Sequence, residues 1–92
     1  MKVSVRIFGE LTTVLGREHT VELDEGSTVA TLASRIGNKK GFTRQGYLGR
    51  YRLGEEELAI LVNGRNIHLL GGVETVLHEG DEVDIQPPVA GD

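Results

Sequence analysis

The chain has 92 residues, no cysteine and a formal net charge of −4. This length predicts one domain over residues 1–92, and the net negative charge argues against general nucleic-acid binding. The lack of cysteine excludes disulfides, thiolate metal sites and cysteine nucleophiles. Apolar runs are far shorter than the roughly 18 residues of a membrane span, so we expect a cytoplasmic protein with no membrane partner.

The beginning of the chain predicts a hairpin of two strands. The sequence KVSVRIF at residues 2–8 alternates apolar and polar residues, which predicts a half-buried strand with Phe8 on its outward face. A polar connection closed by Gly16 follows this strand. HTVEL at residues 19–23 then carries apolar residues two apart and leads into a turn at residues 24–26, so it predicts the second strand.

One helix of about ten residues is expected next, at the short end of the usual range. Ser27 and Thr28 both offer a side-chain oxygen for the N-cap, and apolar residues then recur at helical spacing. Gly37 suits the position just after a helix and is the predicted end. Residues 37–54 are rich in glycine and show no sustained period, so they are interpreted as a long loop.

A third strand and a tight turn are predicted in the second half of the chain. The apolar run at residues 58–62 is typical of a buried strand. Asn63 and Gly64 after it favour the positive φ angles of a two-residue hairpin turn. Residues 66–70 would then be the short return strand.

The last strand completes the predicted fold. Val83 and Ile85 alternate with polar residues, and Pro87 and Pro88 end the strand because neither has an N–H for the ladder. One helix crossing between hairpins predicts an α+β fold whose first and last strands lie side by side in the middle. This arrangement is the β-grasp, a mixed sheet of four to five strands with one main helix packed on one face. Residues 87–92 are expected to form a flexible C-terminal tail.

Three stretches of the sequence carry a resemblance to a known family. They are RIFGELTTVLGRE near the start, LVNGRNIHLLGG in the middle and EGDEVDIQPPVAGD at the end. In this order they resemble the MoaD and ThiS group of ubiquitin-like sulfur carriers, and most of all the small subunit of molybdopterin synthase. The resemblance implies a β-grasp sulfur carrier of molybdenum cofactor biosynthesis, which is not an enzyme by itself.

The resemblance also implies which chemistry the chain takes part in. Such carriers react through their own C-terminal carboxylate, which an E1-like adenylyltransferase of the MoeB or ThiF type adenylates with ATP. A sulfur donor then converts the adenylate to a thiocarboxylate, and the large subunit of molybdopterin synthase, of the MoaE type, receives the sulfur. No cofactor or metal is expected on the chain itself, because the partner uses the ATP.

The tail residues suit such chemistry because a free carboxylate must be activated inside a partner's pocket. Gly91 is the expected acyl carrier. Two prolines keep the arm extended and reduce the entropy that is lost when it enters a partner. We expect partner contacts at Phe8, Leu61, Gln86, Pro87, Pro88, Val89 and Ala90.

Two positions depart from the pattern of the family. The family usually ends in two glycines, whereas this sequence ends in Gly91 and Asp92. Asp92 is then trimmed, is tolerated by the partner, or marks a copy that has lost carrier activity. Gln86 stands where an aromatic residue is common. Two other functions therefore stay open: a ubiquitin-like modifier of the small archaeal type, which forms isopeptide bonds with lysines, and a carrier-derived interaction domain with an inactive tail.

The basic segment between Gly37 and Gly54 has two interpretations. Aromatic residues interleaved with basic ones are typical of single-stranded RNA binding. We favour the other interpretation, in which the aromatic residues anchor a long loop on the sheet, because an unanchored loop loses too much entropy. Nucleic acid is therefore not an expected partner. The aromatic residues are Phe42, Tyr47 and Tyr51, and the basic residues are Lys39, Lys40, Arg44, Arg50 and Arg52.

The three histidines of the chain lack the close spacing of a metal site. We therefore expect His19, His68 and His78 to be surface residues and no metal to be bound.

Overall fold

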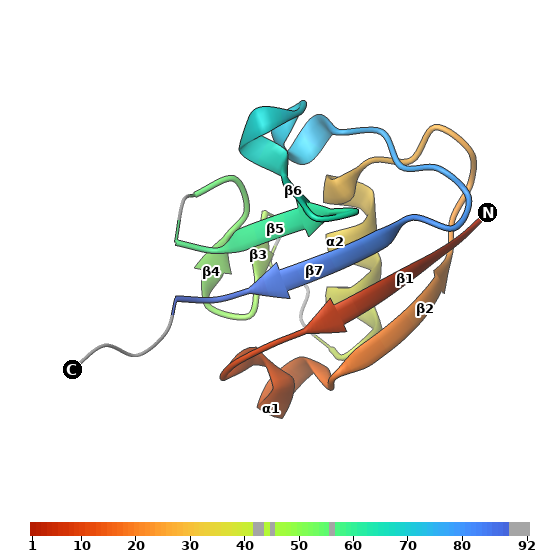
Figure 1. Ribbon diagram of the computed structural model, residues 1–92. Coiled ribbons are helices and arrows are strands. Elements are labelled where there is room, and N and C mark those ends of the chain that lie inside the picture. The colour runs from red at the N-terminus through yellow and green to blue at the C-terminus, as the bar shows by residue number, and fades with distance from the viewer. Residues whose placement is uncertain (42–43, 45, 56, 89–92) are drawn as a thin grey trace.

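A five-stranded mixed sheet organises the chain, and one long helix crosses one of its faces (Figure 1). The computed structural model describes residues 1–41, 44, 46–55 and 57–88. The strands of the sheet are β1 (Lys2–Ile7), β2 (Glu18–Glu22), β5 (Ala59–Val62), β6 (Arg65–Asn66) and β7 (Glu82–Gln86). Their order is β2-β1-β7-β5-β6.

The two central strands come from opposite ends of the chain. β1 and β7 are parallel, with Val5 beside Val83 and Ile7 beside Ile85, whereas all other neighbours in the sheet are antiparallel. The predicted adjacency of the first and last strands is thus confirmed. Together with the one main helix, it confirms the β-grasp fold.

The main helix α2 (Val29–Lys39) begins where the sequence predicts and ends later. The hydroxyl of Thr28 accepts from the N–H of Thr31 at 3.4 Å, so Thr28 is the N-cap. The predicted end at Gly37 is wrong, because Gly37 lies inside the helix on its buried face. Gly41, with φ +86°, follows the C-cap instead and provides the left-handed conformation that a helix end favours.

The connection after β1 contains a short helix that the sequence analysis missed. The predicted polar connection is wrong in this part, since α1 (Leu11–Leu15) forms there. Leu11 and Leu15 are both buried and close one end of the core. They are four residues apart and therefore lie on one face of the helical turn.

The predicted long loop contains a two-stranded hairpin. Its strands are β3 (Tyr47–Leu48) and β4 (Tyr51–Arg52), which pair antiparallel in a small second sheet. Leu48 is fully buried and Tyr51 is 5% exposed. The described part of this segment is therefore anchored on the core, as the favoured interpretation of its aromatic residues requires. Phe42 lies outside the described residues.

The turn after β5 is confirmed, but most of the return strand is not. Asn63 and Gly64 have φ angles of +51° and +85°, as a two-residue hairpin turn requires. The predicted strand at 66–70 is wrong beyond Asn66, because Ile67–Leu69 forms a 3-10 helix. The side chain of Asn66 starts this helix by accepting from the N–H of His68 at 2.9 Å.

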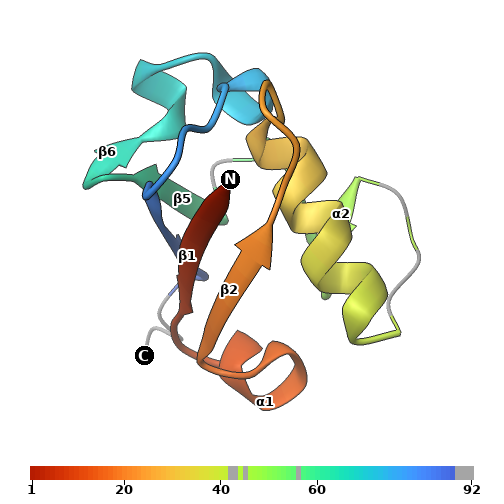
Figure 2. The same ribbon diagram turned by 90° about the vertical axis from the view of Figure 1, so that its right-hand side faces the viewer.

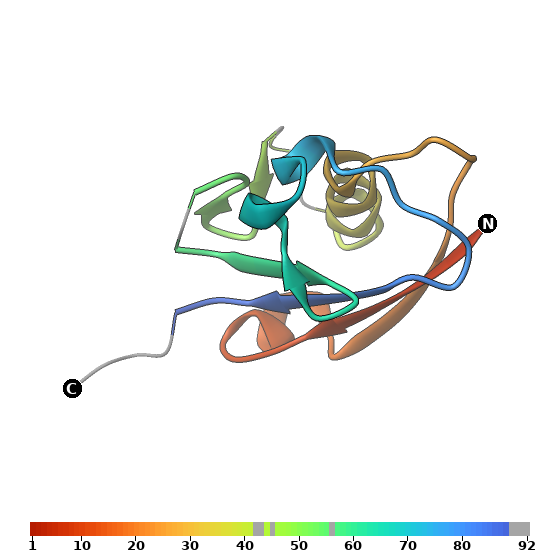
Figure 3. The same ribbon diagram turned by 45° about the horizontal axis from the view of Figure 1, so that its top comes forward.

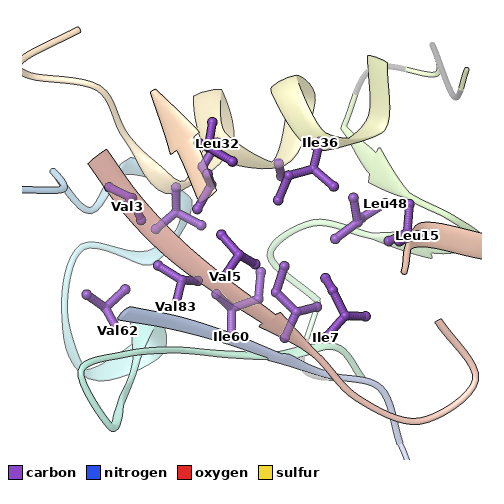
Figure 4. Packing of buried hydrophobic residues seen from close by; sticks show 14 of the residues in the cluster. Val3, Val5, Ile7, Leu15, Leu32, Ile36, Leu48, Ile60, Val62 and Val83 are labelled. Carbon is purple, nitrogen blue, oxygen red and sulfur yellow. The ribbon is translucent and has the colours of Figure 1, made fainter. Parts of the chain in front are cut away.

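The hydrophobic core fills the space between the sheet and α2 (Figure 4). Inward residues of β1, β5 and β7 alternate with outward ones and contact Leu32 and Ile36 of the helix. Figure 3 shows α2 and the β3–β4 hairpin on the same side of the sheet, so within the described part of the chain the other face stays uncovered. Among the described residues, no helix is long and apolar enough to span a membrane.

Truncating Leu48 tests whether the hairpin belongs to the core. We expect Leu48→Ala to lower the free energy of unfolding by about 2–5 kcal/mol, because its side chain is fully buried. Leu69→Ala is the matched control and should change it by less than about 0.5 kcal/mol, because Leu69 is 82% exposed. Urea unfolding measures both values. Equal losses in the two variants would show that the hairpin is not part of the folded core.

Candidate functional site

The uncovered face of the sheet carries a paired charge beside an exposed aromatic ring. Arg6 of β1 and Asp84 of β7 are neighbours in the parallel register and form a bidentate ion pair. Its two hydrogen bonds join Nε to Oδ1 at 2.9 Å and Nη2 to Oδ2 at 3.0 Å. The hydrogen bond and charge of Asp84 raise the pKa of Arg6 above its ordinary value. The same guanidinium lies 5.5 Å from the centre of the Phe8 ring, so the pair helps to orient this ring.

Of the predicted contact residues on this face, Phe8 and Gln86 lie at the C-terminal ends of β1 and β7, and Leu61 lies on β5. Phe8 is 40% exposed, which confirms its predicted outward position. Gln86 is exposed and pairs with Ala59 in the antiparallel register. Leu61 is half-buried and lies beside Asp84 in the next row of the same face. Their roles as partner contacts stay predictions.

The base of the predicted tail is packed onto the globule. Pro87 is buried, and a side chain at Gly9 would place its Cβ 3.0 Å from the Pro87 ring. Gly9 also has φ +65°, so the chain passes close to Pro87 only because position 9 lacks a side chain. Pro87 is therefore part of the globule, and of the two prolines Pro88 is the exposed one.

The remaining tail residues of the sequence prediction lie outside the described residues. They are Val89, Ala90, Gly91 and Asp92.

A groove of about 590 Å³ surrounds the point where the described chain ends. Its lining combines Phe8, Gln86 and both prolines with residues that the sequence analysis did not assign to the site. The additional lining residues are Gly9, Glu10, Arg50 and Tyr51. The groove has an exposed aromatic wall on one side and a charged wall on the other, as a surface for a protein partner commonly has.

The charged wall is a cluster of three side chains, Glu10 and the adjacent Arg50 and Tyr51, from two distant parts of the chain. The hydroxyl of Tyr51 donates to the Glu10 carboxylate, and Arg50 donates to the same oxygen at 2.6 Å. Arg50 also lies 5.0 Å from the centre of the Tyr51 ring. These contacts tie the β3–β4 hairpin to the start of α1. Glu10 and Tyr51 are 41 positions apart, so no local sequence pattern could have linked them.

The cluster shifts the pKa of all three members, and the hydrogen bond to Glu10 raises the pKa of Arg50 above its ordinary value. The Tyr51 hydrogen bond, followed by the Arg50 hydrogen bond, lowers the pKa of Glu10 below its ordinary value. The hydrogen bond to Glu10 raises the pKa of Tyr51, because it favours the neutral hydroxyl. The charged Glu10 and the neutral Tyr51 are therefore the forms that hold the hairpin in place.

The histidines do not form a metal site in the described part of the chain, where no group of acidic and histidine residues could hold an ion. His68 and His78 are exposed, as predicted. The prediction for His19 is wrong: its side chain is 8% exposed and contacts the carbonyl oxygen of Leu15. His19 points inward because it alternates with the outward residues of β2.

Comparison with known proteins identifies the family. The model of the ThiS family matches residues 5–91. This chain belongs to the ThiS family. A protein from Archaeoglobus fulgidus, described as a candidate sulfur carrier, is 53% identical over 34 residues. That match covers 37% of this chain and 39% of the relative.

Two solved structures resemble this ThiS-family protein over nearly its whole length. A candidate molybdopterin converting factor, subunit 1, from Pyrococcus furiosus is 28% identical with a TM-score of 0.71, and covers 97% of this chain and 99% of its own. The small archaeal modifier protein 1 from Methanosarcina acetivorans is 29% identical with a TM-score of 0.75, and covers 99% and 96%. The family includes sulfur carriers and ubiquitin-like proteins, and both likenesses fit this membership.

Replacing Tyr51 tests the geometry of the charged wall. We expect Tyr51→Phe to raise the pKa of Glu10 toward its ordinary value, because the hydrogen bond that lowers it most is lost. The matched control is Tyr47→Phe, because Tyr47 lies against Arg44 and not against Glu10. Titration of the side-chain carboxyl signals by NMR gives both values. A pKa of Glu10 that does not change in Tyr51→Phe would contradict the contact.

The same shift predicts a pH dependence of stability. The folded-state pKa of Glu10 is lower than its unfolded value, so its contribution is present above the unfolded pKa, near 4.5. It is lost as the pH falls through the folded pKa. Urea unfolding at about pH 7 and at about pH 3 measures this contribution. Between these two values, the free energy of unfolding should fall less in Glu10→Gln than in the unmodified chain.

Proposed function

We propose that this protein is a cytoplasmic sulfur carrier of molybdopterin biosynthesis and is not catalytic by itself. Its C-terminal carboxylate would be adenylated with ATP by an E1-like adenylyltransferase of the MoeB or ThiF type. Attack by a sulfur donor on the acyl carbon would release AMP and leave a thiocarboxylate. The carrier would then deliver this sulfur to a pterin precursor on a synthase subunit of the MoaE type.

The observation that carries the proposal is the position of Pro88, where the described part of the chain ends. Parallel pairing with β1 brings Pro88 out beside the exposed Phe8, at the rim of a groove. An apolar ring at the base of an arm gives a partner a surface to bind while the arm enters its pocket. Membership of the ThiS family and the likeness to the Pyrococcus furiosus protein support the same assignment.

Gly91 is the residue that we propose to carry the acyl group, once Asp92 has been removed. A terminal aspartate would place a second carboxylate beside the reacting carboxyl, where the negatively charged phosphates of ATP must approach. Val89 and Ala90 would form the slim part of the arm between Pro88 and Gly91. Trimming therefore removes both bulk and charge from the reacting end.

Three forms of the chain test this assignment, ending at Asp92, Gly91 or Ala90. Each is incubated with the adenylyltransferase of the source organism, ATP and a sulfur donor, and its intact mass is measured. We expect the form ending at Gly91 to exchange one oxygen for sulfur, and the form ending at Ala90 to stay unchanged. No exchange in the Gly91 form would contradict the carrier function, and exchange with Asp92 retained would contradict trimming.

Truncating Phe8 tests the docking surface. We expect Phe8→Ala to slow thiocarboxylate formation by about tenfold or more, as loss of a central aromatic contact does. Its free energy of unfolding should change by less than about 1 kcal/mol, because the ring is 40% exposed. Leu69→Ala, on the 3-10 helix outside the groove, is the control and should react at the unmodified rate. Equal rates in both variants would show that partners dock elsewhere.

A second candidate function is protein modification. The likeness to the small archaeal modifier protein 1, 29% identical over 99% of this chain, supports it. The same activated carboxyl would then form isopeptide bonds with lysines of other proteins. Expression of a tagged chain ending at Gly91 separates the two functions, because a modifier gives a ladder of conjugates that survives reduction and boiling, whereas a carrier alone gives none.

A further inference from the structure

The edge strand β2 has main-chain groups that point away from the sheet. It lies on the side of β1 that is remote from β7, and α2 runs beside it (Figure 2). In the antiparallel ladder, Leu23 exchanges hydrogen bonds with Met1, and Arg17 accepts from Ile7 at 2.8 Å. Such bonds involve every second residue of a strand, so the N–H and C=O groups of the alternate residues face away from β1. These are Glu18, Thr20 and Glu22.

Only part of this edge is covered in the described structure. Arg35 of α2 donates to the carbonyl oxygen of Glu22 at 3.0 Å and so covers one group. The hydrogen bonds among the described residues give no partner to the outward main-chain groups of Glu18 and Thr20. An edge strand with free N–H and C=O groups is a template for another strand.

The charges on the uncovered face alternate from strand to strand and stop at this edge. One row runs from Asp84 on β7 to Arg6 on β1 and Glu18 on β2. In a second row, Lys2 of β1 lies beside Glu22 of β2. Both rows end in an acidic residue. A strand with basic residues opposite these two would continue the alternation, and opposite charges on facing strands are stabilising.

The same charges disfavour pairing between two copies of this chain. If two β2 strands paired antiparallel around Thr20, Glu18 of one copy would lie opposite Glu22 of the other. Parallel pairing in register would place each glutamate opposite itself. Like charges directly opposite one another are destabilising. The edge therefore selects a strand of different composition.

A groove of about 480 Å³ lies between β2 and α2. Its lining determines which side chains an added strand can have on the face toward α2. β2 lines it with residues 20–22, and α2 lines it with Ile36, Asn38 and two basic residues, Arg35 and Lys39. Side chains that enter the groove next to Val21 would meet an apolar floor and a basic rim. They must therefore be apolar or acidic, because basic side chains would be repelled.

We propose that the edge of β2 binds an extended segment of another protein as an additional strand. The segment has Lys or Arg opposite Glu18 and Glu22, and apolar side chains facing α2. Main-chain hydrogen bonds to Glu18 and Thr20 give affinity, and the two glutamates give specificity, as in other cases of strand addition. Since β2 and β7 lie on opposite sides of β1, an added strand at β2 would not cover the C-terminal end of β7. The proposal does not rest on the sulfur-carrier function.

A designed peptide tests this surface directly. Its core is Lys-Val-Thr-Ile-Lys, which presents lysines opposite both glutamates in either strand direction, and the control has the core Glu-Val-Thr-Ile-Glu. We expect saturable NMR shifts in the amides of β2 and of the last turns of α2, and slower exchange of the Thr20 amide. The affinity of the control peptide should be lower by about tenfold or more.

Two variants separate strand addition from simple charge attraction. Thr20→Pro removes only an outward N–H, which an edge strand tolerates, so the chain should keep its fold and lose the peptide. The double change Glu18→Lys and Glu22→Lys should reverse the preference, so that the glutamate peptide binds better. The proposal is overturned if no saturable shifts occur, if both peptides bind the unmodified chain equally, or if folded Thr20→Pro binds as well as the unmodified chain.

Discussion

The parallel pairing of β1 with β7 is the constraint on which the rest of this structure depends. It joins the two ends of the chain at the centre of the sheet and continues past the strands, where the N–H of Phe8 donates to the carbonyl oxygen of Ile85 at 3.0 Å. Parallel strands end at the same edge, so the exposed ring of Phe8 and the exit of the tail must lie together. Packing of Pro87 on Gly9 then holds the chain against the sheet up to Pro88.

The charged wall of the groove depends on contacts between segments that are distant in the sequence. The hairpin of β3 and β4 is short, but the burial of Leu48 and the link between Tyr51 and Glu10 hold it against α1. This arrangement places Arg50 at the groove from which the arm leaves. A segment with few strand hydrogen bonds is ordered by such anchors, because they offset the entropy of a long connection.

Local patterns in the sequence predicted the elements that have a strong period, and they missed those that depend on contacts from elsewhere. Alternation predicted β1 and β7, and Asn63 with Gly64 predicted the turn after β5. The end of α2 was misplaced because Gly37 is both a common helix terminator and a small residue that can be buried inside a helix. The Glu10–Arg50–Tyr51 cluster was not predictable, since its members meet only after the sheet has formed.

The central claim is that a partner engages the end of the sheet where β1 and β7 finish. Amide hydrogen exchange of the chain, with and without the adenylyltransferase of the source organism, tests it most directly. The account predicts that exchange slows at Phe8, Gly9, Arg50 and Gln86, around the groove at the base of the arm. Slowing confined to the opposite end of the sheet, at the turn of Asn63 and Gly64 and at Gly80, would contradict it.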